Sequence, residues 1–282
     1  MKTKTFLLLL LAVLPLAAQT QPDIANDNLV LVPVFFSGAG GHGSQWTTDV
    51  NVWSTSTSSA DLEMPVPLLE SPSSGCIDLD GFINAFAPRP ICEGFESPAG
   101  LLLYVPKTVD PHDVQVQARI SDTTHSVTSA GTQIPVVRES EFRDHDFLLT
   151  NIPSDPRFRA NLRIYGLTEI VGTNHSVLCG GQTVPFTIYD SRDTFLDHFP
   201  IAQGSLTLSA PQAGPTGPLF IHPAYASIGD LVAAFPQLAN VPSYDIRIHA
   251  VQTLADPPRT LTYWGFVTLT NNETQEVTAI AP

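Results

Sequence analysis

Residues 45–53 read QWTTDVNVW, and their apolar and polar side chains alternate from one position to the next. A side-chain period of two is typical of a β-strand with one buried face, because successive side chains point to opposite sides of a strand. Val50 and Val52 fall on one side of such a strand, and Asp49 falls on the other. The pattern therefore predicts a half-buried strand, with the two valines in the core, rather than a catalytic motif.

A second stretch, RFRANLRIY at residues 157–165, repeats the pattern. It has Leu162 and Ile164 at the two valine positions and Asn161 at the position of Asp49. Asp49 and Asn161 are both short polar acceptors, and we expect them to support a neighbouring turn. Later segments also correspond, such as GLLLYV and YDIRIHAV. Duplication of one sandwich unit is the economical explanation.

Short runs rich in Val, Ile, Thr, Leu and aromatic residues recur along the chain, interrupted by many of its 25 prolines and 18 glycines. This spacing favours an all-β sandwich or barrel over a fold that alternates strands with helices. We expect two tandem immunoglobulin-like antiparallel β-sandwich domains, repeat 1 at 28–137 and repeat 2 at 142–282. Each should contain one short helix, at 77–86 and 227–235, because apolar residues there recur at helical spacing before a proline.

The chain begins MKTKTFLLLLLAVLPLAAQT, in which two lysines precede an apolar run that ends in small residues. This order is typical of a secretory signal peptide, here residues 1–18, with cleavage after Ala18. The apolar run is too short to span a bilayer, and no later segment is longer. We therefore expect a mature chain without a transmembrane segment, located outside the cell, in the periplasm or on the cell surface.

The three cysteines are Cys76, Cys92 and Cys179. In an oxidising compartment a Cys76–Cys92 disulfide is expected, because it would close a short excursion of the chain, and Cys179 would then be an odd thiol. A zinc site is not expected, since no Cys-x-x-Cys motif or closely spaced histidine pair accompanies the cysteines.

An excess of acidic residues, 27 against 13 lysines and arginines, gives a formal net charge of −14. Nucleic acid is therefore not an expected partner.

The glycine-rich residues 37–45 match neither a phosphate-binding loop nor a nucleophile elbow, and a flexible loop is expected. In RDHDF, residues 143–147, His145 lies between two carboxylates, which would raise its affinity for a proton or stabilise it as a metal ligand. A single histidine without a partner at ligand spacing is more often a solvated linker residue. The acidic pairs DPHD and DSRD are expected in turns. We identify no catalytic residue, no cofactor site and no metal ligand.

Aromatic side chains are the candidate ligand contacts. Exposed aromatic rings on a sandwich face can stack on sugar rings, and the alternative role for each is packing in the core. The candidates are Trp53, Tyr189, Tyr225, Tyr263 and Trp264.

Four segments together resemble the layout of uncharacterised secreted bacterial proteins of acidobacterial type. They read VPVFFSGAGGHGSQWTTDVNVW, DPRFRANLRIY, GDLVAAF and WGFVTLTNNETQEVTAIAP. The resemblance implies two tandem β-sandwich units in an exported protein. It implies no activity, cofactor or site residue.

Two functions of different class are compatible with these features. The first is a secreted, non-catalytic interaction or structural module, a monomer or weak oligomer whose partner is a surface polymer or protein. The alternative is a hydrolase of an extracellular polysaccharide or peptide. A deep pocket with perturbed titratable groups would favour the hydrolase, whereas a shallow patch or an exposed strand edge would favour the binder.

Overall fold

The computed structural model describes residues 27–55, 60–61, 82–83, 89–91, 97–106, 109–110, 112–124, 131–170, 175–177, 180–192, 199–213, 220–251 and 259–282. The expected signal peptide and the expected Cys76–Cys92 disulfide lie outside these residues, as does Cys179. Among the described residues, no helix has the length and apolar character needed to cross a membrane.

The first half of the chain forms two antiparallel sheets. Sheet A has the strand order β10-β1-β7, and sheet C has the order β2-β3-β8-β9 with β6 also paired to β3. A separate two-stranded ladder joins β4 and β5. The strands are β1 Asp27–Val32, β2 Ser37–Ala39, β3 Gln45–Ser54, β4 Ala60–Asp61, β5 Phe82–Ile83, β6 Arg89–Pro90, β7 Leu101–Pro106, β8 Val114–Asp122, β9 Thr132–Ile134 and β10 Val137–Arg138.

The second half forms two further antiparallel sheets. Sheet G has the order β11-β19-β14-β15, and sheet F has the order β13-β12-β20-β21 with β18 also paired to β12, while β16 and β17 form a separate ladder. The strands are β11 Phe147–Pro153, β12 Phe158–Ile170, β13 His175–Val177, β14 Thr183–Asp190, β15 Ala202–Thr207, β16 Gln212–Ala213, β17 Phe220–His222, β18 Ala224–Ile228, β19 Ser243–Ile248, β20 Arg259–Asn271 and β21 Val277–Ile280.

Five strands of each half occur in the same chain order and pair in the same way. In the first half β1 pairs with β7, β3 with β8, and β8 with β9. In the second half β11 pairs with β19, β12 with β20, and β20 with β21. All six pairings are antiparallel, so the two halves share a common arrangement of these strands.

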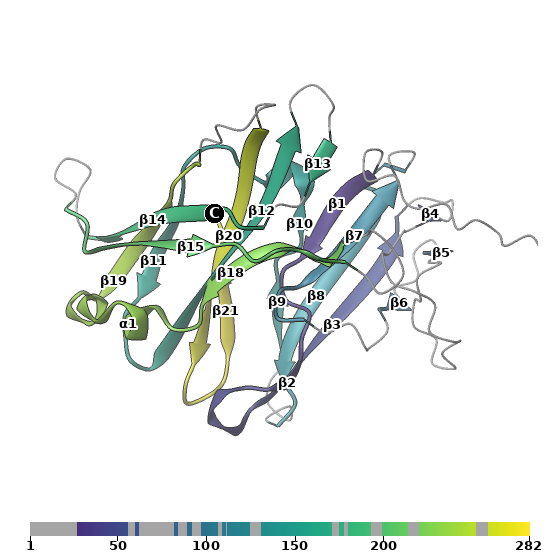
Figure 1. Ribbon diagram of the computed structural model, residues 1–282. Helices are drawn as coiled ribbons and strands as arrows, with labels where there is room; N and C mark the ends of the chain where they lie inside the picture. The colour runs from purple at the N-terminus through teal and green to yellow at the C-terminus, as the bar shows by residue number, and fades with distance from the viewer. Residues whose placement is uncertain are drawn as a thin grey trace, which may run out of the picture.

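The four sheets are stacked in the order C, A, F and G, which runs from right to left in Figure 1. One hydrophobic cluster joins side chains of sheet C, sheet A and one side of sheet F. A second cluster joins the other side of sheet F to sheet G. Sheets A and F are therefore inner layers, each covered on both faces.

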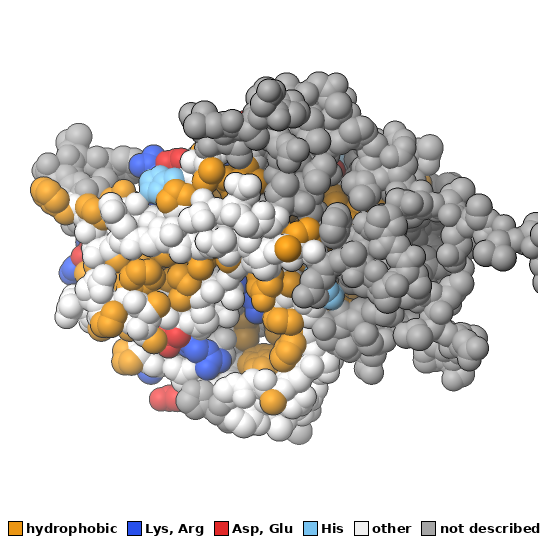
Figure 2. Space-filling model, in the orientation of Figure 1, with side chains coloured by type: hydrophobic (Ala, Val, Ile, Leu, Met, Phe, Trp, Pro, Cys, Tyr) orange, Lys and Arg blue, Asp and Glu red, His pale blue; other side chains and the backbone are white. Residues whose placement is uncertain are grey.

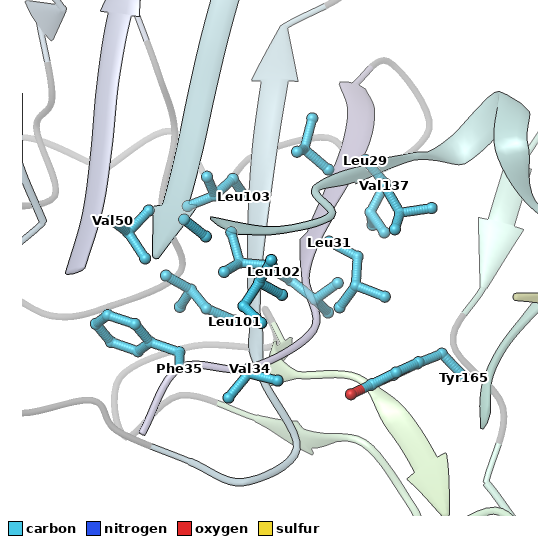
Figure 3. Close-up of a cluster of buried hydrophobic side chains, with 14 of the residues drawn as sticks. Leu29, Leu31, Val34, Phe35, Val50, Leu101, Leu102, Leu103, Val137 and Tyr165 are labelled. Atoms are coloured by element: carbon cyan, nitrogen blue, oxygen red, sulfur yellow. The ribbon is translucent and has the colours of Figure 1, made fainter. Parts of the chain in front are cut away.

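Burial on both faces explains the uninterrupted apolar runs in β1 and β7. Every residue from Leu101 to Val105 is buried, without the alternation of a half-exposed strand. Figure 3 shows Leu101, Leu102 and Leu103 between Val50 of sheet C and Tyr165 of sheet F. Each fully buried leucine contributes about 1.5–3 kcal/mol through removal of apolar surface from water. Sheet A is thus the apolar centre of the first cluster.

The core positions predicted from the alternating stretches are confirmed. Val50 and Val52 are buried on β3, and Leu162 and Ile164 are buried on β12. The two stretches differ at their last residues, since Trp53 is half-buried whereas Tyr165 is fully buried. The difference arises because β3 belongs to an outer sheet and β12 to an inner one.

Hydrogen bonds also join the two halves. The hydroxyl of Tyr165 donates to the carbonyl of Pro33, and Nη1 of Arg163 donates to the carbonyl of Pro98. On β17, Nδ1 of His222 donates to the carbonyl of Gly100 at 2.9 Å. Polar contacts therefore fix how the second half is placed against sheet A.

Only one of the two expected helices is present in the described residues, and it is shorter than expected. Helix α1, Leu231–Ala234, begins after Asp230, whose Oδ1 accepts hydrogen bonds from the backbone N–H groups of Val232 and Ala233 at 3.1 and 3.2 Å. Proline then begins the 3-10 turn η4, Pro236–Asn240. Within 77–86 the described residues Phe82–Ile83 form β5, so the helix prediction is wrong there, as suits two residues with high β-propensity.

The expected turn-supporting role of Asp49 and Asn161 is also wrong. Both lie in the middle of long strands, and in the part of the chain that the structure describes neither side chain bonds to a turn. Asp49 is exposed opposite Arg119, while Asn161 lies opposite Thr268. The Oδ1 of Asn161 is buried and has no hydrogen-bond partner among the described residues. The all-β class is confirmed, whereas the immunoglobulin-like and tandem-domain details stay predictions.

Two adjacent truncations test the two-sided burial of sheet A. Leu102 and Leu103 are both fully buried and point to opposite sides of β7. We expect Leu102→Ala and Leu103→Ala each to lower the free energy of unfolding by about 2–5 kcal/mol. Leu148→Ala, at a position that is 43% exposed, should cost less than about 1 kcal/mol. Urea denaturation measures all three, and a near-neutral result for either β7 variant would contradict the inner-layer position of sheet A.

Candidate functional site

The predicted aromatic platform does not form at Tyr263 and Trp264. Tyr263 is 0% exposed and Trp264 is 4% exposed, so neither can contact a ligand at the surface. They belong to different hydrophobic clusters, on opposite faces of sheet F. The prediction fails at these positions because β20 runs through the middle of a sheet that is covered on both sides.

Tyr225 belongs to an aromatic cluster between sheets F and A. Its ring lies 6.1 Å from that of Tyr165 at an angle of 24°, and Trp264 lies 6.1 Å from Tyr165 and 5.1 Å from Phe266. Burial raises the pKa of Tyr165 to about 12. These rings serve packing between the layers, although Tyr225 is half-buried at the edge of the cluster.

Trp53 is different, because it lies on the outward side of sheet C. Register places Gln115 opposite Trp53, Gln117 opposite Asn51, and Arg119 opposite Asp49. Val50 and Val52 occupy the other side of β3, in the core. We call this outward surface the amide face, and it comprises Asp49, Asn51, Trp53, Gln115, Gln117, Arg119 and Gln133.

The amide face offers a stacking surface beside neutral hydrogen-bonding groups. Each Asn or Gln side chain can donate and accept, which suits hydroxyl groups, and an indole ring packs against apolar ring faces. On the described part of the face shown in Figure 2, a few charged side chains lie among hydrophobic side chains and white atoms, which include the backbone. The chemistry of the amide face therefore suits an uncharged polar ligand better than a highly charged one.

A second polar arrangement lies on the outward side of sheet G. The carboxylate Oδ2 of Asp146 accepts from Nδ1 of His249 at 3.1 Å, and Nε2 of His249 lies 2.7 Å from Oγ1 of Thr187. The backbone N–H of Ala250 donates to Oδ1 of Asp146 at 2.9 Å, and Nε of Arg247 lies 3.0 Å from Oδ2. We call this set the Asp146 network.

The charge state of Asp146 follows from these contacts. Burial alone would raise its pKa, but hydrogen bonds from the Ala250 backbone and His249, with the charges of His249 and Arg247, together hold the pKa below its usual value. An ionised carboxylate can only accept, so Nδ1 of His249 donates to Asp146, and Nε2 faces the hydroxyl of Thr187. This order of carboxylate, imidazole and hydroxyl can polarise a hydroxyl group. Thr187, however, is only 6% exposed.

The structure separates the residues of RDHDF. Nδ1 of His145 contacts Oδ1 of Asp144 at 2.9 Å, and both side chains are exposed, while Asp146 turns to His249. Local sequence gave no signal for the Asp146 network, because 103 positions separate Asp146 from His249. The turn role predicted for the acidic pairs is seen at Asp110 and Asp190, which accept from backbone N–H groups two residues later.

The part of the chain that the structure describes contains no group of three or more His, Cys, Asp or Glu side chains that could hold a metal ion. Comparisons with known proteins add little to this picture. No family model matches the sequence, and no curated protein matches it. Among solved structures, the infectious bursal disease virus VP2 subviral particle is similar over 91% of this chain and 71% of the VP2 chain, at 10% sequence identity. Its TM-score of 0.19 is too low to support an argument about function.

The Asp146 network predicts a pH dependence of stability. Because the folded-state pKa of Asp146 lies below its unfolded value, the stabilisation is present above the unfolded pKa of about 3.9 and is lost as the pH falls through the folded value. Asp146→Asn should lower the melting temperature at pH 7 and flatten its decline between about pH 5 and pH 2. Asp49→Asn, which removes an exposed carboxylate on sheet C, should behave like the parent chain. Equal slopes for Asp146→Asn and the parent chain would contradict this assignment.

Proposed function

We propose that the protein is a secreted, non-catalytic interaction module that binds an extracellular or cell-surface polymer through the amide face. The observation that carries the proposal is the half-buried Trp53 on an outward sheet face, with Gln115 and Gln117 on the adjoining strand. Its aromatic ring and neutral amides suit a polysaccharide chain, whose sugars combine apolar ring faces with hydroxyl groups. Neither nucleic acid nor a membrane is part of the proposed interaction.

Export and domain organisation belong to the same proposal. Export rests on the charged, apolar and small-residue order of residues 1–18. Two tandem immunoglobulin-like sandwiches, at 28–137 and 142–282, are supported by the strand pairing that recurs in each half. A monomer or weak oligomer with a Cys76–Cys92 disulfide completes the proposal.

A hydrolase of an extracellular polymer is the second candidate, and the Asp146 network is the observation that favours it. In a peptidase of this kind, His249 would accept the proton of Thr187 as the hydroxyl attacks the peptide carbonyl, and would return that proton to the amine as the C–N bond breaks. Water would then release the acyl group from Thr187. The near-complete burial of Thr187 works against this reaction, because a substrate has to reach the hydroxyl oxygen. We therefore place the interaction module first.

Binding and turnover can be measured on the same samples. The purified chain is incubated with a panel of neutral polysaccharides and cell-envelope polymers, and released products are analysed after binding. We expect saturable binding without turnover, and Trp53→Ala should weaken it by about tenfold or more, in line with the ~1–3 kcal/mol that stacking on an aromatic ring contributes in other complexes.

Tyr189→Ala is the matched control, because Tyr189 is a half-buried aromatic residue on the outward side of sheet G. Its binding should equal that of the parent chain. Equal weakening by both substitutions, with unchanged melting temperatures, would exclude the amide face as the binding surface. Product release that Thr187→Val abolishes would establish the hydrolase instead.

A further inference from the structure

The side-chain amide of Gln115 is held in one orientation on the amide face. Register places Gln115 of β8 directly opposite Trp53 of β3, on the outward side of sheet C. Nε2 of Gln115 donates to the carbonyl of His112 at 2.7 Å. A carbonyl oxygen can only accept, so the amide cannot exchange its oxygen and nitrogen without losing this bond. The positions of Oε1 and Nε2 are therefore defined before any ligand binds.

Oε1 of Gln115 is an accessible acceptor beside the indole ring. Gln115 is half-buried, and among the described residues its Oε1 has no hydrogen-bond partner and is not one of the buried unpartnered atoms. Cβ atoms of residues directly opposite each other in an antiparallel pair are about 4.5–5.5 Å apart. A ligand that covers the ring of Trp53 is therefore within reach of Oε1.

The next pair of amides on this face is not fixed in the same way. Asn51 and Gln117 lie opposite each other, two residues further along their strands, which is a distance of about 7 Å. Both are half-buried, and neither side chain forms a hydrogen bond within the part of the chain that the structure describes. Each amide can turn, so it can donate or accept as a ligand requires. Selection between ligand groups therefore falls to Gln115, whose amide cannot turn.

The chemistry of a stacked sugar relates this acceptor to one kind of group. A sugar packs on an indole ring through its C–H face, and equatorial hydroxyl groups then radiate from the edge of the sugar ring. An axial hydroxyl projects from the face instead and hinders stacking. Gln115 lies beside Trp53, where the edge of a stacked sugar would be. A free hydroxyl can donate to Oε1, whereas the oxygen of a methyl ether can only accept.

We propose that Oε1 of Gln115 accepts a hydrogen bond from an equatorial hydroxyl of the sugar stacked on Trp53. The amide face thereby selects neutral glycans whose ring hydroxyls are free and equatorial, as they are in chains of β-1,4-linked glucose. This inference rests on the proposed function, because it names the class of polymer that the amide face binds. Trp53 supplies the stacking surface, and Gln115 determines the specificity.

Titration calorimetry on the full chain tests the acceptor role with two probes. One is a hexasaccharide of β-1,4-linked glucose, and the other is the same hexasaccharide with a methyl ether at every hydroxyl. The parent chain should bind the free form about tenfold or more tightly than the methylated form. Gln115→Met, which removes both polar atoms, should weaken binding of the free form by about three- to tenfold. Gln115→Glu, which keeps acceptor oxygens and loses the donor, should stay within about twofold of the parent chain.

Gln203→Met is the matched control, because Gln203 is an exposed glutamine on β15 of sheet G. It should bind the free hexasaccharide like the parent chain. Equal losses in Gln115→Met and Gln115→Glu would show that the amide donates to the ligand, and would overturn the proposal. Equal affinity of the parent chain for the two hexasaccharides would overturn it too, whatever the variants do.

The outcome for the proposed function is read separately, from the polymer panel. Binding of a panel polymer that requires Trp53, without binding of the free hexasaccharide, would overturn the role of Gln115 and leave the amide face as the binding surface. Failure of every polymer in the panel to bind would overturn the proposed function itself.

Discussion

Contact between the apolar faces of sheets A and F holds the two halves of the chain together. Sheet A has buried side chains on both sides, so sheet C alone cannot cover it. Tyr165, Trp264 and Phe266 of sheet F supply the second cover, and the bond from Tyr165 to Pro33 fixes the approach of the two layers. The positions of the amide face and the Asp146 network both follow from this stacking. Both lie on outer sheets.

Much of the fold could be predicted from local sequence, because the alternation of side chains along a strand is a local property. Alternation identified the core positions Val50 and Leu162, and it separated them from the outward Asp49. Which sheet covers a given face is decided by residues far away in the chain. For this reason Tyr263 and Trp264 were predicted as surface aromatics although both are buried. The uninterrupted run of β7 was the available sign that one layer is covered twice.

The candidate sites were less predictable than the fold. Trp53 could be named from sequence because it is the last residue of the alternating stretch, but its neighbours Gln115 and Gln117 depend on the register between β3 and β8. The Asp146 network depends on contacts between β11, β14 and β19, for which no short motif exists. The corresponding positions Asp49 and Asn161 show the limit of a repeat as a guide. Asp49 faces solvent on β3. Asn161, at the matching position of β12, faces the first half of the molecule.

The two-sided burial of sheet A has a consequence for the order in which the chain is made. Sheet A is complete once Arg138 has emerged, whereas its second cover needs residues up to Phe266. During synthesis, the first half therefore presents an uncovered apolar layer while the second half is still absent. A chain stopped between these points would be prone to self-association and would be a natural client for chaperones. The covering of one half by the other thus makes late completion, rather than early folding of the first half, the step that protects the nascent protein.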